Sequence, residues 1–110
     1  MDLVSRATEL GYVVHLHVVM VSVDVSVGRV AHRVAHGGHA VPEQKIRERY
    51  DRLWSYVADA CAQADRTTFY DNSSARAPYR VVATFERGRT TNEPRWPAWA
   101  PAALTRTPAG

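Results

Sequence analysis

The sequence predicts an α/β fold, and three features of the chain lead to that expectation. Residues 12–21 (YVVHLHVVMV) are almost continuously apolar and rich in valine, which is typical of a strand buried on both faces in a parallel sheet. Residues 42–64 carry apolar side chains at helical spacing. The expected elements follow one another as helix, strand, helix, helix, strand and strand, an order typical of α/β proteins. Because three strands make an incomplete doubly wound sheet, we expect the missing part to be N-terminal.

The first half of the chain contains clear helix-ending signals. Residues 2–10 (DLVSRATEL) are expected to form the end of a helix, with Gly11 as its terminator. After the valine-rich strand, Ser26 is the expected N-cap of the next helix, because a serine hydroxyl accepts a hydrogen bond from the first helical turn. Gly37 and Gly38 are expected to end that helix.

A longer helix is expected to begin at Pro42, since proline suits the first helical position and Glu43 suits the positive end of the helix dipole. Full burial of its larger apolar side chains would stabilise the docked helix by roughly 1.5–3 kcal/mol each. The expected apolar face consists of Ile46, Tyr50, Leu53, Val57, Cys61 and Ala64.

Residues 67–71 and 80–86 are expected to be two further strands. Past residue 88 the chain has four of its prolines and no periodicity. We therefore expect one domain over residues 1–88 and a disordered tail over 89–110. Trp96 and Trp99 could still dock on something, but an exposed tail is the favoured interpretation.

The bulk composition excludes several classes of protein. No run of 18 apolar residues exists and the N-terminus lacks a secretory pattern, so we expect a cytoplasmic protein without a membrane segment. Cys61 is the only cysteine, so no internal disulfide can form. The net charge of +3 is spread along the chain and gives little support to nucleic-acid binding.

Arginines gather in the segment 29–50, on the two helices that flank the Gly-Gly-His loop. Arg29 and Arg33 are four residues apart and share a helix face, and Arg47 and Arg49 lie on the second helix. Two helices hinged at glycines can close over a polyphosphate and bring guanidinium groups to a phosphoryl group. The competing interpretation is that these arginines only form solvated helix faces.

This segment resembles the zeta toxin family of P-loop kinases. The pattern R-V-x-x-R-V-x-x-G-G-H-x-V-P-x-x-x-I-x-x-R-Y runs from Arg29 to Tyr50, follows a Gly-Tyr-led strand and precedes a strand that ends Tyr-Asp-Asn-Ser at residue 73. The resemblance covers roughly residues 2–88. It implies a partial P-loop NTPase, that is, a fragment of a three-layer α/β/α fold with a two-helix lid. The lid arginines of that family contact nucleotide phosphates, so the resemblance points to Arg33 and Arg49 first and to Arg29 and Arg47 next, around the lid loop of Gly37, Gly38 and His39.

The same resemblance implies a parent activity, namely transfer of the γ-phosphoryl group from ATP to a UDP-amino sugar with Mg²⁺ bridging the phosphates. The 110 residues contain no G-x-x-x-x-G-K-[ST] loop, and Lys45, the only lysine, has no glycine loop around it. Glu48 stands where many relatives carry a further arginine. We therefore expect no catalytic residue in this chain and no kinase activity from it alone. The alternative is a non-catalytic binding module whose strand at 12–21 docks on a separately encoded N-terminal half or on an antitoxin-like partner.

Three other groups of residues have competing interpretations. His32 and His36 have metal-ligand spacing with His39 nearby, but no carboxylate or cysteine completes a set, so a structural role is favoured over a metal site. His15 and His17 share one strand face, where hydrogen-bonded core or interface histidines are the favoured interpretation. The Asp-Asn-Ser sequence at 71–73 is expected to form a turn.

Overall fold

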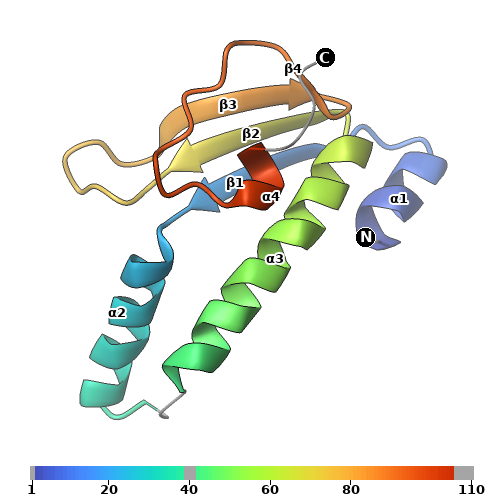
Figure 1. Cartoon of the computed structure of the whole chain (residues 1–110). Coiled ribbons are helices and arrows are strands. Elements are labelled where there is room, and N and C mark those ends of the chain that lie inside the picture. Colours follow the sequence, from blue (N-terminus) through green and yellow to red (C-terminus); the bar gives the residue numbers. More distant parts are fainter. Residues whose placement is uncertain (1, 39–41, 106–110) are drawn as a thin grey trace.

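A four-stranded mixed sheet organises the chain, with helices packed against one of its faces (Figure 1). The computed structural model describes residues 2–38 and 42–105. The helices are α1 (Asp2–Glu9), α2 (Val23–Ala35), α3 (Glu43–Gln63) and α4 (Ala102–Thr105). The strands are β1 (His15–Met20), β2 (Arg66–Asp71), β3 (Arg80–Glu86) and β4 (Arg89–Thr90). The α/β class expected from the sequence is therefore confirmed.

The strands are arranged in the order β1-β2-β3-β4. The β1 and β2 strands are parallel, and helices α2 and α3 make the crossover between them. The β3 strand runs antiparallel to β2, with an irregularity at Phe69/Tyr70, and β4 continues the meander. Asp65 fixes the start of β2 beside β1, because its Oδ2 accepts a hydrogen bond of 2.8 Å from the Val14 amide.

The core lies between the sheet and the helices. Met20, Phe69 and Phe85 project from the strands and are at most 2% exposed. Trp54 of α3 and Leu104 of α4 pack against the same cluster. A smaller cluster joins α1 to the C-terminal end of α3. It contains Val4, Ala60 and Ala64, with Val14 and Leu16 packed against it.

The opposite face of the sheet differs from expectation. We predicted that residues 12–21 would be buried on both faces, but β1 alternates between exposed and half-buried positions until Met20. His15, His17 and Val19 are exposed, because the helices of the described residues cover only the other face. The described chain therefore forms two layers rather than the expected three.

The two long helices begin and pack differently from the prediction. Ser22, not Ser26, is the N-cap of α2, and its hydroxyl accepts a hydrogen bond of 3.2 Å from the Val25 amide. In α3 the predicted core residue Leu53 is 49% exposed, whereas its neighbour Trp54 is 4% exposed. The apolar stripe is rotated by one position because the large indole fills the space beneath β1 and β2.

The segment 89–105 also corrects the prediction of a disordered tail. It contains β4 and α4 and returns across the core, where Trp96 lies 5.2 Å from the Phe69 ring and Trp99 packs on the same cluster. Apolar burial by two tryptophans and Leu104 compensates for the poor intrinsic order of a proline-rich segment. The boundary expected after residue 88 is thus not a boundary between ordered and disordered chain, at least as far as Thr105.

No helix within residues 2–38 and 42–105 is long and apolar enough to cross a membrane.

Candidate functional site

The α2–α3 hairpin leaves the sheet at the carboxyl end of β1, beside the carboxyl end of β2 (Figure 1). Ligands of open α/β sheets bind outside the carboxyl ends of parallel strands, which makes this end the first place to look for a site. Tyr50 connects the hairpin to the sheet, because its hydroxyl donates a hydrogen bond of 2.7 Å to the Val21 carbonyl. Burial raises the pKa of Tyr50 above its usual value, so the phenol keeps its proton for this bond.

Arg47 clamps the two helices together along one flank. Its guanidinium lies 3.0 Å from the Asp24 carboxylate on α2 and 3.4 Å from the Glu43 carboxylate on its own helix. The hydrogen bond to Asp24 is the main cause of a raised pKa for Arg47. The sequence predicted Arg47 as a phosphate ligand, whereas this geometry has it paired with two carboxylates.

The other three predicted arginines lie away from that clamp. Arg33 follows Asp24 by nine residues, which places it about 180° around α2 at 3.6 residues per turn. Arg49 follows Arg47 by two residues, about 200° around α3. Arg33 and Arg49 therefore each lie on a different side of their own helix from the Asp24–Arg47 pair. Arg29 lies one turn before Arg33 on the same face.

These three arginines are exposed, and none makes an ion pair with another residue of the described chain. A shallow depression along α2 is lined by the side chains of Arg29 and Arg33 together with Val25, Gly28 and His32. A surface with several cations and no carboxylate partner is suited to an anionic ligand. We refer to Arg29, Arg33 and Arg49 as the arginine flank.

The two glycines predicted to end α2 do so in the structure. Gly37 has a φ of +96°, a conformation that other residues rarely adopt. A Cβ on Gly38 would lie 2.9 Å from the Arg33 carbonyl oxygen, and the Gly38 amide donates a 2.8 Å hydrogen bond to that same oxygen. Glycine is therefore required at both positions for the chain to turn here. His39, the third predicted loop residue, lies outside the described residues.

Asp71 organises the carboxyl end of β2. Its Oδ1 accepts hydrogen bonds of 2.9 Å from the Ser73 amide and 2.6 Å from the Ser73 hydroxyl, and its Oδ2 lies 3.1 Å from the Arg80 guanidinium. Burial alone would raise the pKa of Asp71, but the bonds from Ser73 and the Arg80 ion pair outweigh it and lower that pKa. The predicted Asp-Asn-Ser turn is present, with Asn72 accepting from the Tyr79 amide.

The histidines do not form a metal centre with the residues that the structure describes. The rings of His32 and His36 lie 4.3 Å apart, and Nδ1 of His36 lies 2.8 Å from the His32 carbonyl oxygen. No group of three or more potential ligands occurs in the described parts of the chain. Cys61 is buried, and burial raises the pKa of its thiol, as is typical of a cysteine that packs as a small apolar residue.

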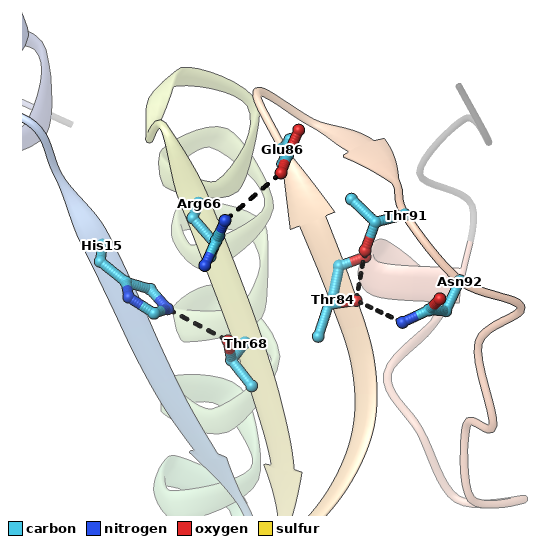
Figure 2. A network of polar contacts seen from close by, with 7 residues as sticks. All are labelled: His15, Arg66, Thr68, Thr84, Glu86, Thr91 and Asn92. Atoms are coloured by element: carbon cyan, nitrogen blue, oxygen red, sulfur yellow. Dashed lines mark hydrogen bonds and ion pairs between the residues drawn. The ribbon is translucent and has the colours of Figure 1, made fainter.

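Sequence reasoning missed a polar network on the open face of the sheet (Figure 2). It consists of three neighbouring sets of contacts: His15 of β1 with Thr68 of β2, Arg66 of β2 with Glu86 of β3, and Thr84 of β3 with Thr91 and Asn92 beyond β4. The alternation of Arg66 and Thr68 within β2 was the available signal. It could not be interpreted without knowing that this face is uncovered.

No protein-family model, curated protein or solved structure was found to match this chain.

Proposed function

We propose that this chain is the lid-bearing half of a zeta-toxin-like P-loop kinase and that its arginine flank binds the phosphates of Mg²⁺-ATP. The observation that carries the proposal is the exposure of Arg29, Arg33 and Arg49 on the two helices of the hairpin, free of acidic partners within the described residues. The resemblance of residues 29–50 to the lid of that family supports it. So does the position of the hairpin at the carboxyl end of the parallel strands.

Arg47 and the arginine flank would have different roles in such a lid. Arg47 is paired with Asp24 across the two helices, which leaves Arg29, Arg33 and Arg49 as the arginines proposed to bind the ligand. Guanidinium groups bind phosphate through paired N–H donors, and they stabilise the charge of a transferring phosphoryl group. In the parent reaction that group moves from ATP to a hydroxyl of a UDP-amino sugar.

These 110 residues contain no G-x-x-x-x-G-K-[ST] loop, so the chain by itself is proposed to hold nucleotide phosphates without transferring them. Mg²⁺ would be bound through the nucleotide, since no cluster of potential ligands occurs among the described residues. Activity would require a phosphate-binding loop and a catalytic carboxylate supplied from outside these 110 residues.

Binding is measured by isothermal titration calorimetry of the purified chain with Mg²⁺-ATP and with Mg²⁺-tripolyphosphate. Arg33→Ala and Arg49→Ala should each weaken the binding of both ligands by about tenfold or more, because a hydrogen bond to a charged group contributes roughly 1.5–3 kcal/mol. Arg6→Ala is the matched control. Arg6 is also an exposed helical arginine, but it lies on α1, which packs beside Ala60 and Ala64 at the C-terminal end of α3. Undiminished binding by the Arg33→Ala/Arg49→Ala double variant would refute the proposal.

A second candidate function, a docking module, is favoured by the outer edge of β1. The Arg66 amide bonds to the Val14 carbonyl and the Asn72 amide to the Met20 carbonyl, so the even-numbered residues of β1 face β2. The N–H groups of His15, His17 and Val19 therefore point away from the sheet, and no charged residue or proline of β1 protects this edge. Nearby, Val13 is 85% exposed.

Such an edge can accept a strand of a separately encoded N-terminal half or of an antitoxin-like partner. Val19→Pro removes one outward N–H while leaving the bonds to β2 in place. It should abolish co-purification with a co-expressed polypeptide carrying the missing loop, whereas Val19→Thr should not. Equal co-purification of the two variants would eliminate edge pairing as the docking mode.

A further inference from the structure

We propose that the polar pocket on the open face of the sheet binds a small oxyanion, either a free phosphate or a carboxylate group, between Arg66 and His15. The pocket has a volume of about 240 Å³ and is lined by His15, Arg66, Thr68, Thr84, Phe85, Glu86 and Thr91. A water molecule accounts for about 30 Å³ of liquid, so the space accommodates one small anion with part of its hydration shell. This site lies on the sheet, apart from the arginine flank.

The lining is rich in groups that can donate a hydrogen bond to an anion. Thr68 lies on the floor and is only 8% exposed. Its hydroxyl lies 3.1 Å from Nε2 of His15. On the other side, Thr84 contacts the Thr91 hydroxyl and accepts a bond of 3.3 Å from the Asn92 amide. Hydroxyls can turn their protons toward an incoming oxygen, so the pocket adapts to an acceptor without moving the backbone.

Arg66 supplies the fixed charge (Figure 2). Its only ion pair in the described chain is a single contact of 3.5 Å to Glu86, and both side chains are more than half exposed. Exposed single-contact pairs of this kind contribute little to stability. Since a guanidinium has five N–H donors, most of the donors of Arg66 remain available to a ligand. The Glu86 carboxylate would compete with an external oxyanion for the donors of Arg66.

His15 makes the binding dependent on pH. The titratable and charged groups around it are His17 on its own strand, Arg66 on β2 and, beyond Arg66, Glu86 on β3. Partial desolvation on the sheet surface, together with His17 and Arg66, lowers the pKa of His15 and so favours its neutral form in the absence of a ligand. An anion next to the ring would favour the imidazolium form, and by linkage protonation would favour the anion. The affinity for acetate, whose charge stays constant near neutral pH, should therefore increase as the pH falls from neutral.

The test is an NMR titration of the full ¹⁵N-labelled chain with inorganic phosphate, at constant ionic strength maintained with chloride. We expect saturable shifts at the amides of Thr68, Thr84 and Thr91, with one dissociation constant. Arg66→Gln should weaken binding by about tenfold or more, whereas Glu86→Gln should strengthen it by removing the competing carboxylate. Arg33→Ala should leave these shifts unchanged, which separates this site from the proposed lid.

A parallel titration with acetate distinguishes a carboxylate site from a phosphate site. Saturation by either anion, with the opposite effects of the two substitutions, supports the proposal. Non-saturating shifts, shifts confined to α2 and α3, or equal affinities for wild type and Arg66→Gln would overturn it. Because both substitutions are at exposed side chains, folding is expected to survive; the dispersion of the amide spectrum verifies this before each titration.

Discussion

Leu104 provides the most direct test of how the C-terminal segment is packed. Its side chain is 2% exposed and lies in the main core cluster with Trp54 and Phe69. Leu104→Ala removes buried methyl groups and leaves a space beneath α4, a change that costs about 2–5 kcal/mol of unfolding free energy in well-packed cores. A domain of this length loses about 4 °C of melting temperature per kcal/mol. We therefore expect the midpoint to fall by about 8–20 °C.

Leu53→Ala is the matched control, because it deletes the same atoms from a side chain that is 49% exposed. An exposed helical position changes the free energy of unfolding by about 0.5 kcal/mol or less, so the midpoint should move by no more than about 2 °C. Both variants are compared with wild type by thermal melting followed by circular dichroism and by urea unfolding.

The sequence pattern and the structure make opposite forecasts for this pair. The pattern places Leu53 in the core and Leu104 in a disordered tail; the structure reverses the two. A melting temperature lowered more by Leu53→Ala than by Leu104→Ala would refute the packing described above. An equal, small effect of both substitutions would show that residues 89–105 do not contribute to the folded state.

Further predictions concern pH, glycine positions and local opening. Because the pKa of His15 is lowered in the folded state, the unfolded chain binds more protons than the folded chain near this pKa. Stability should fall as the pH drops below about 6.5, and His15→Asn should remove this phase of a pH–melting curve. The pKa of Asp71 is also lowered. The ionised Asp71 carboxylate therefore stabilises the folded state above about pH 4, and this stabilisation is lost as the pH falls through the folded-state pKa. Asp71→Asn should eliminate this loss of stability at acid pH while lowering stability at pH 7. Gly88→Ala should destabilise the protein, because Gly88 has a φ of +80° and a new Cβ would lie 3.0 Å from the Ala62 Cα. Gly28→Ala, in an open position within α2, should instead stabilise it by about 0.5–1 kcal/mol. Differential scanning calorimetry of the two variants and the wild type measures both effects. Amides of α2, which has no buried residue, should exchange with solvent faster than those of the C-terminal half of α3.

The element order and most strand and helix positions could be predicted because local signals agreed with the final contacts. The strand at 80–86 has the bounds expected from its residues, and Gly11 ends the first helix with a φ of +87°. The N-cap of α2 was misplaced because Ser22 and Ser26 lie about one helical turn apart and either serine can cap a helix. Only the position at which β1 ends decides between them.

The errors in burial have a different physical origin. Helical spacing alone allowed a stripe through Leu53 or one through Trp54, and the choice depends on the sheet surface that the helix meets. Similarly, the proline-rich composition after residue 88 contains no local signal for order. Its order comes from long-range contacts of Trp96 with Phe69 and Phe85, which no local pattern reveals.

The candidate site was predicted in part, for a related reason. Arginine positions on a helix follow from periodicity, so Arg29 and Arg33 could be assigned to one face in advance. Whether an arginine is free or paired depends on a carboxylate brought from elsewhere in the chain. For Arg47 that carboxylate belongs to Asp24, on the preceding helix, and only the folding of the hairpin shows that it is close.

The two arms of the hairpin differ in how firmly they are held, and this difference bears on what the hairpin can do. The α3 helix is anchored by Trp54, Ala60 and Cys61, all buried, whereas α2 buries no residue fully. Besides partly buried contacts with α3, α2 is held near its start by the Tyr50 bond to Val21 and by the exposed Asp24–Arg47 pair. Exposed ion pairs contribute little free energy, so we expect α2 to open locally more readily than α3. A ligand that binds arginines on both arms would favour the closed arrangement by its differential affinity alone. The sparse burial of α2 is therefore what the proposed lid requires, and a fully buried α2 would argue against it.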